Sequence, residues 1–273
     1  YQIQQKWMRN MNINSLKQSL EIAGTLGDTS KMPGNCYGIP AAEGKFVERI
    51  CKDRGWQVPP QFGCTIGQIL ARIKGSTCEI CYANERANYG YPSVQIAQTK
   101  RVVGIHKPEW VDAMVYLLKH TFDKQFKQAL TDQIDFFFCN EHRSPNANEM
   151  KELEDKANFE CAYFRWHDSG DILGIWHLNK IYDVVEQTPF LKHWLPTRET
   201  SMVLKNNRSV PDNLLIRHSS HMINGPLPKR VKNMSGVTTN GDYTCHAPDN
   251  ANECGDCRKC WDKKVELVVY PSH

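Results

Sequence analysis

Two groups of cysteines, far apart in the chain, limit most strongly what this sequence can fold into. The first group is Cys64, Cys78 and Cys81, and the second is Cys245, Cys254, Cys257 and Cys260. A Cys-x-x-Cys turn brings two thiolates within reach of one soft metal ion or one iron–sulfur cluster. We therefore expect a fold that builds two metal centres, or one centre shared by both groups.

The composition indicates the setting in which these thiols work. The chain has 273 residues, 40% of them hydrophobic and 23% charged, which is ordinary for a globular protein with a full core. The polar start of the sequence does not have the character of a secretion signal, and no apolar run reaches the roughly 20 residues of a membrane helix. We expect a cytoplasmic protein without membrane contact, whose 11 cysteines serve as ligands rather than disulfides.

The net charge of +4 is unevenly distributed, and basic residues cluster at 100–101, 229–232 and 258–264. Such clusters bind the phosphates of nucleic acids. They also occur as plain solvated surface, so they favour a nucleic-acid or nucleotide partner without establishing one.

The second half of the chain alternates between short apolar runs and helical patterns. Strands are expected at residues 136–139, 161–166, 190–195, 202–205, 214–217 and 265–270, and helices at 14–27, 42–54, 108–130, 148–156 and 177–187. Cys139 ends the first of these runs and is expected to fill core. This alternation predicts an α/β fold with parallel strands, either open or closed into a complete or partial TIM-like barrel. We expect a helical extension over residues 1–29, the barrel over 30–235, and a cysteine-rich, metal-binding appendage over 236–273.

Polar residues follow three successive expected strands. They are His167, Asp168, Ser169, Gly170 and Asp171, then Thr197, Arg198 and Glu199, then Ser219. Functional residues of parallel α/β folds gather at the carboxyl ends of strands, so we expect an active site here in which His167, Asp168 and Asp171 converge as catalytic residues. Each residue also has a plainer interpretation, because Ser169 or Asp171 would suit a helix N-cap and Arg198–Glu199 a surface ion pair.

The two cysteine groups favour different centres. Three cysteines on one loop can ligate three irons of a four-iron cluster and leave the fourth iron open for a small ligand, whereas a structural zinc would need a fourth ligand that the local sequence lacks. The four C-terminal thiols could ligate a second cluster or a tetrahedral zinc. His273 could replace Cys245 in a Cys₃His zinc site.

Several segments of the chain resemble a bacteriophage family known as the gene-product eighty-eight family. They lie at residues 30–33, 74–83, 164–171, 194–198, 213–219 and 254–261. This resemblance implies a phage protein that acts in the host cytoplasm, and it brings no established activity with it.

A more distant similarity suggests a mechanism. Cys-x-x-Cys-Tyr-Ala, then Ser-Gly-Asp after one strand and Thr-Arg after the next, is similar to radical S-adenosylmethionine enzymes of the spore-photoproduct-lyase type. The resemblance implies a 4Fe-4S cluster on Cys64, Cys78 and Cys81, and S-adenosylmethionine beside Ser169, Gly170, Asp171, Thr197, Arg198 and Ser219. The thirteen residues between Cys64 and Cys78 are a longer gap than that superfamily usually has. The implied function is modification of a nucleobase or nucleotide in nucleic acid.

A rival resemblance starts from Asp168-Ser-Gly, which is similar to a turn of the tRNA-guanine transglycosylases and of their phage relatives that insert 7-deazaguanines into DNA. It implies a catalytic Asp168, Asp242 as a nucleophile, and a zinc ion on Cys254, Cys257, Cys260 and His273. A third interpretation is a metal-stabilised DNA-binding protein without catalysis.

Overall fold

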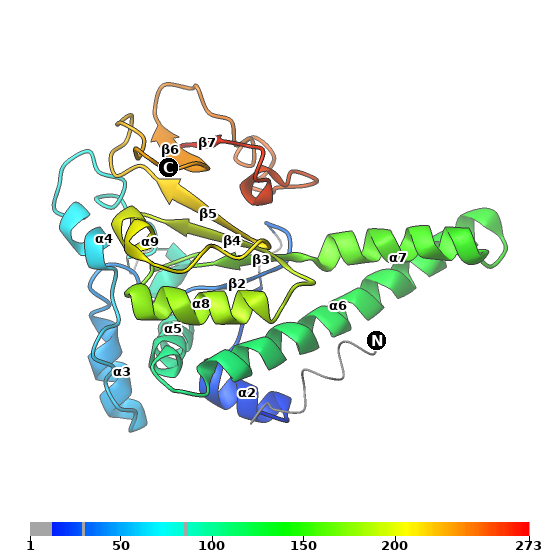
Figure 1. Cartoon of the computed structure of the whole chain (residues 1–273), viewed down its shortest axis with the longest axis horizontal. Coiled ribbons are helices and arrows are strands. Elements are labelled where there is room, and N and C mark those ends of the chain that lie inside the picture. Colours follow the sequence, from blue (N-terminus) through cyan, green and yellow to red (C-terminus); the bar gives the residue numbers. More distant parts are fainter. Residues whose placement is uncertain (1–12, 29–30, 85–86, 273) are drawn as a thin grey trace.

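The computed structural model describes residues 13–28, 31–84 and 87–272 (Figure 1). The helices of these residues are α2 (Leu16–Ala23), α3 (Phe46–Arg54), α4 (Thr65–Leu70), η2 (Ala87–Gly90), α5 (Pro92–Ile105), α6 (Trp110–Glu141), α7 (Ala147–Cys161), α8 (Ile175–Glu186), α9 (Thr200–Lys205) and η3 (Lys259–Trp261). The strands are β1 (Gly27–Asp28), β2 (Asn35–Tyr37), β3 (Tyr163–Trp166), β4 (Lys192–Thr197), β5 (Leu214–Ser219), β6 (Met234–Thr238) and β7 (Leu267–Pro271).

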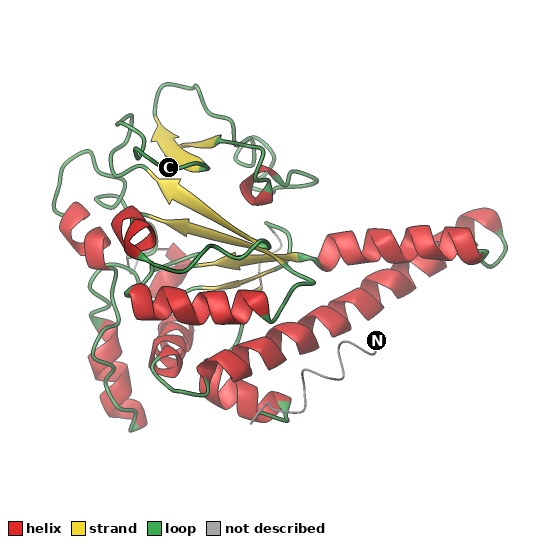
Figure 2. Cartoon of the chain, in the orientation of Figure 1, coloured by secondary structure: helices red, strands yellow, loops and turns green. Residues whose placement is uncertain are grey.

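These strands form one sheet in chain order, β1 to β7 (Figure 2). Only β1 and β2 pair antiparallel, and every other neighbouring pair is parallel. The expected mixed α/β fold with a mostly parallel sheet is confirmed. The expected barrel is not confirmed, because no pairing between β7 and β1 closes the sheet within the described residues.

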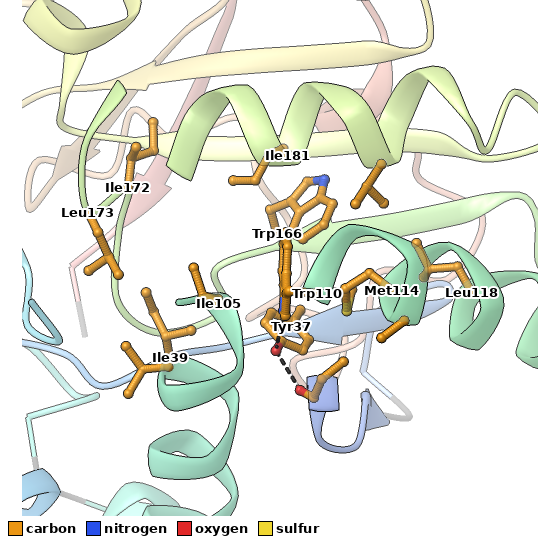
Figure 3. Close-up of a cluster of buried hydrophobic side chains, with 14 of the residues drawn as sticks. Tyr37, Ile39, Ile105, Trp110, Met114, Leu118, Trp166, Ile172, Leu173 and Ile181 are labelled. Atoms are coloured by element: carbon orange, nitrogen blue, oxygen red, sulfur yellow. Dashed lines mark hydrogen bonds between the residues drawn. The ribbon is translucent and has the colours of Figure 1, made fainter. Parts of the chain in front are cut away.

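One face of the sheet packs on α2, α5, α6 and α8, which all lie on the same side in Figure 1. Alternate strand residues, including Phe164, Trp166 and Leu195, enter this core, as the period of two in a strand requires. Tyr37, Trp110 and Trp166 meet at its centre (Figure 3), where the Trp110 indole donates to the Tyr37 hydroxyl at 3.1 Å. Tyr37 in turn donates to the Ala23 carbonyl at 2.5 Å and so fixes α2.

The other face of the sheet carries a second, smaller cluster formed by Tyr163, Trp194 and Trp261. Trp261 belongs to η3, so the C-terminal segment packs on this face. The expected domain boundary at Gly236 falls inside β6, and β7 extends the same sheet beyond it. The described C-terminal residues do not show a formed metal-binding appendage.

Two expected strands are wrong. Residues 136–139 are the last turns of α6, which forms a long hairpin with α7 that extends away from the sheet (Figure 1). The apolar run that suggested a buried strand lies on this hairpin, where Phe136 is 71% exposed and Cys139 is exposed rather than in the core. Residues 202–205 lie in α9, because so short an apolar run does not distinguish strand from helix.

The remaining expected strands correspond to β3, β4, β5 and β7, and the expected helices to α2, α3, α6, α7 and α8. None of the helices in the described part of the chain has the length and apolar character needed to cross a membrane.

Candidate active site

A cavity of about 320 Å³ lies at the carboxyl edge of the parallel strands and extends along the face of the sheet opposite the main core. Its wall contains the first cysteine group and the polar turns after the strands. The sequence-predicted residues that it brings together are Cys64, Cys78, Cys81, His167, Asp168, Ser169, Gly170, Asp171, Thr197, Arg198 and Ser219. Segments more than 130 residues apart therefore share one cavity, as the strand-end rule predicts.

The three cysteines of the first group come from the connection between β2 and η2. Cys64 precedes α4 and its N–H donates to the Ala42 carbonyl at 2.8 Å, while Cys78 and Cys81 share a turn closed by a 3.2 Å bond between their backbones. Gly67 shows how close two of the sulfurs are. A Cβ atom at Gly67 would lie 3.4 Å from the Cys64 Sγ and 3.9 Å from the Cys78 Sγ. Both sulfurs thus lie close to Gly67, where a side chain would collide with the Cβ of Cys64.

The end of β4 holds this cysteine segment in place. The Ile66 N–H, in the first turn of α4, donates to the Glu199 Oε1 at 2.6 Å. The Arg198 Nε donates to the Thr77 hydroxyl at 2.8 Å, next to Cys78. Glu199 is 3% exposed, so the expected surface ion pair with Arg198 is wrong, and Glu199 instead supports Cys64 through α4. Burial raises the pKa of Glu199 to about 7.

Asp171 joins the turn after β3 to the turn after β4. Its Oδ1 accepts from the Thr197 hydroxyl at 2.6 Å and from the Ile172 N–H at 2.7 Å, and its Oδ2 accepts from the Arg198 N–H at 2.9 Å. Burial raises the pKa of Asp171 although these three bonds oppose the rise. The predicted catalytic carboxylate is therefore fully engaged in positioning Thr197 and Arg198.

Ser169 and Gly170 form a tight turn beneath the cavity. The Ser169 hydroxyl donates to the Ile39 carbonyl at 2.9 Å and accepts from the Gln98 amide at 2.6 Å. Gly170 has φ +78°, and a Cβ there would lie 2.8 Å from the Ile39 carbonyl oxygen. The turn thus packs against the segment that follows β2, which fixes the cavity floor.

His167 and Asp168 differ in what they can contribute. Both ring nitrogens of His167 are buried without a hydrogen-bond partner among the described residues, and burial, aided by Arg165, lowers its pKa to about 3. His167 is therefore neutral near pH 7 and has no proton to donate as an imidazolium. Asp168 accepts from the Tyr89 hydroxyl at 3.0 Å, and its backbone carbonyl accepts from Tyr82 at 2.9 Å.

The second cysteine group lies outside the cavity wall but borders it. Cys245, Cys254 and Cys260 are partly buried, and Cys257 is exposed. Burial raises the pKa of Cys254, and the nearby thiols of Cys245 and Cys257 raise it further. The Cys260 Sγ contacts the hydroxyl of Tyr270, a cavity residue, at 3.2 Å. The predicted ligand His273 lies outside the described residues.

Neither group forms a ready-made site for one ion. Among the described residues, no three His, Cys, Asp or Glu side chains lie close enough together to hold a single metal ion. All eleven cysteines, in either group or elsewhere, are free thiols in this structure.

Sequence reasoning missed three residues of this site. Glu199 looked like a surface charge, Gly67 lies inside a helix, and Arg165 lies inside an apolar strand. Gly67 and Arg165 could have been found from the sequence. A glycine in a helix and a charged residue in a buried strand both lower stability, so each indicates a specific structural or functional role.

The comparisons with known proteins settle the family. The family described as gene product 88 matches residues 9–263. The chain belongs to the gene product 88 family. Comparison with curated proteins and with solved structures gives no match.

Proposed function

We propose that this member of the gene product 88 family is an iron–sulfur enzyme that uses S-adenosylmethionine to modify a nucleobase or nucleotide in the phage-infected cytoplasm. One observation carries the proposal: three thiols and the polar turns after β3 and β4, distant in sequence, line one cavity at the carboxyl edge of a parallel sheet. The strands of the sheet follow one another in chain order and are mostly parallel, which suits the resemblance to radical S-adenosylmethionine enzymes.

The residues present fit a four-iron cluster in donor type. Three soft thiols match a cluster with one open iron, whereas tetrahedral zinc needs four ligands with sulfurs about 3.8 Å apart. Sulfurs that bind three different irons stand farther apart than that. The sulfurs of Cys64 and Cys78 both lie beside Gly67, in the wall of the cavity that Cys81 also lines.

When bound and reduced by an external one-electron donor, such a cluster would supply the electron for reductive cleavage of the sulfonium bond of S-adenosylmethionine. The chain's own residues have positioning tasks. Glu199 and Arg198 hold the two sides of the cysteine segment, and Asp171 fixes the turn that carries Thr197. The β3 turn then forms the floor on which the cofactor would rest.

The resemblance to the transglycosylases receives less support. Asp242, its implied nucleophile, is exposed and does not belong to the cavity wall. No contact of the described residues brings it to Asp168.

The test is the dithionite-dependent formation of 5′-deoxyadenosine from S-adenosylmethionine by anaerobically prepared protein. We expect formation by the unaltered chain and loss in Cys78→Ser, with Cys139→Ser as the matched control because Cys139 is an exposed thiol on the α6–α7 hairpin. Equal product from Cys78→Ser and Cys139→Ser, or none from the iron-loaded protein, would overturn the proposal.

A further inference from the structure

Arg165 occupies a position in the cavity wall that the proposed function does not use. It lies on β3, on the face of the sheet away from the main core, and it lines the cavity. Its guanidinium carbon lies 4.7 Å from the centre of the Trp194 ring. Stacking on an aromatic ring holds the plane of the guanidinium and leaves its edges free to donate hydrogen bonds.

The donors of Arg165 are largely unused. One terminal nitrogen, Nη1, donates to the Met32 sulfur at 3.6 Å, which is a weak contact. Nε is buried and has no hydrogen-bond partner in the part of the chain that the structure describes. Arg165 also makes no ion pair with a described carboxylate. The Arg165 guanidinium thus keeps an unpaired donor, and guanidinium donors bind oxyanions through charge-assisted hydrogen bonds.

The groups around Arg165 keep its guanidinium charged. Burial acts to lower the pKa of Arg165, but Tyr82, Asp168 and Tyr270 outweigh it. One oxygen of Asp168 accepts a hydrogen bond from the Tyr89 hydroxyl, and the other oxygen is buried. The second arginine of the cavity wall, Arg198, uses its Nε to donate a hydrogen bond to the Thr77 hydroxyl.

Hydroxyl donors lie in the same wall. Ser219, Ser235 and Ser272 all line the cavity, and the Ser235 hydroxyl donates to the Ser219 hydroxyl at 2.9 Å. A guanidinium with an unpaired donor and serine hydroxyls in the wall of the same cavity are the kind of donors that bind phosphate groups.

We propose that Arg165 binds a phosphate group of the substrate, so that the enzyme acts on a nucleoside monophosphate unit, free or within a single strand. The statement that the enzyme modifies this nucleotide rests on the proposed function, whereas the binding of its phosphate by Arg165 does not. A cavity of about 320 Å³ is at the lower end of the range for small-molecule sites and is too small to admit a duplex. Nucleic acid would therefore have to present one unstacked nucleotide at a time.

The experiment is calorimetric titration of the full, anaerobically prepared chain with the four deoxynucleoside 5′-monophosphates and, separately, with the four nucleosides. We expect at least one monophosphate to bind at least about tenfold tighter than its nucleoside. Arg165→Gln should weaken binding of that monophosphate by about tenfold to a hundredfold and leave nucleoside binding unchanged, because a charge-assisted contact with the phosphate is lost. The affinity of Arg165→Lys for the monophosphate should lie between those of Arg165→Gln and the unaltered chain. Arg54→Gln, at the exposed end of α3, should bind the monophosphate as tightly as the unaltered chain does.

A short single-stranded oligonucleotide, titrated in parallel, separates the two sources of the phosphate, since a preference for it over the monophosphate assigns the site to a strand. The inference is overturned if no monophosphate binds tighter than its nucleoside, or if Arg165→Lys keeps the full preference. If Arg165→Gln does not fold, the comparison of phosphate preference between Arg165→Lys and the unaltered chain tests the inference instead. Normal 5′-deoxyadenosine formation without phosphate preference would refute this inference alone. A phosphate preference in protein that takes up no iron would refute the proposed function alone.

Discussion

Replacing Gly67 by alanine tests the geometry of the first cysteine group. Gly67 lies inside α4, where its φ is not in the left-handed region, so an alanine could adopt the same backbone. In an unobstructed helix interior this change stabilises by about 0.5–1 kcal/mol. Here the new Cβ would lie 2.8 Å from the Cβ of Cys64, closer than real Cβ contacts, and 3.4 Å from its sulfur.

Cys64 must therefore move, and overpacking of this kind costs about 1–3 kcal/mol. The balance predicts that Gly67→Ala lowers the free energy of unfolding by about 1 kcal/mol instead of raising it. Iron uptake should fall as well, because the methyl group occupies space beside two sulfurs. Denaturant unfolding followed by circular dichroism, with an iron assay, measures both effects, and Ile69→Ala on the exposed side of α4 is the control. A stabilised variant with full iron uptake would refute the reasoning.

Three further predictions concern buried charges around the site. Asp171→Asn should cost about 2 kcal/mol or more in denaturant unfolding, because an amide donor would face groups that now donate to the carboxylate; an unchanged midpoint would contradict this. Glu199 has a pKa of about 7 when folded and an ordinary value of 4.5, so stability should fall by about 3 kcal/mol as pH rises from about 4.5 to 7. Glu199→Gln should remove this slope and be the more stable protein at pH 8, as unfolding at several pH values will show. Arg217→Met should cost about 3 kcal/mol and speed proteolysis of the C-terminal segment, because Arg217 donates to three backbone carbonyls there and on β6, at Met234, Lys259 and Val265.

The layout of the sheet and the edge that carries the site were accessible from the sequence. Apolar runs ending in polar triplets predicted β3, β4 and β5, and parallel strands bring their carboxyl ends to one edge. Asp171 and Thr197, distant in sequence, meet there in a 2.6 Å hydrogen bond. The cysteine pattern predicted that Cys64, Cys78 and Cys81 act together, and all three line the cavity.

Other features depend on tertiary contacts that no local pattern encodes. Glu199 is buried because α4 docks on the end of β4, and a sequence window does not contain that contact. The run at Phe136 belongs to a helical hairpin whose length is set by pairing with α7 rather than by the local apolar pattern. Closure of a barrel likewise depends on whether distant edge strands meet, which strand patterns do not determine.

The most direct test of the account is elemental analysis of anaerobically purified protein. It measures iron, acid-labile sulfide and zinc per chain in the unaltered protein and in Cys64→Ser, Cys78→Ser and Cys139→Ser. We predict iron with an equal amount of sulfide in the unaltered chain. Cys64→Ser and Cys78→Ser should lose the iron and sulfide of one four-iron cluster, and Cys139→Ser should keep the full content. Iron that is absent from the unaltered protein, or that is the same in all four proteins, would contradict the account.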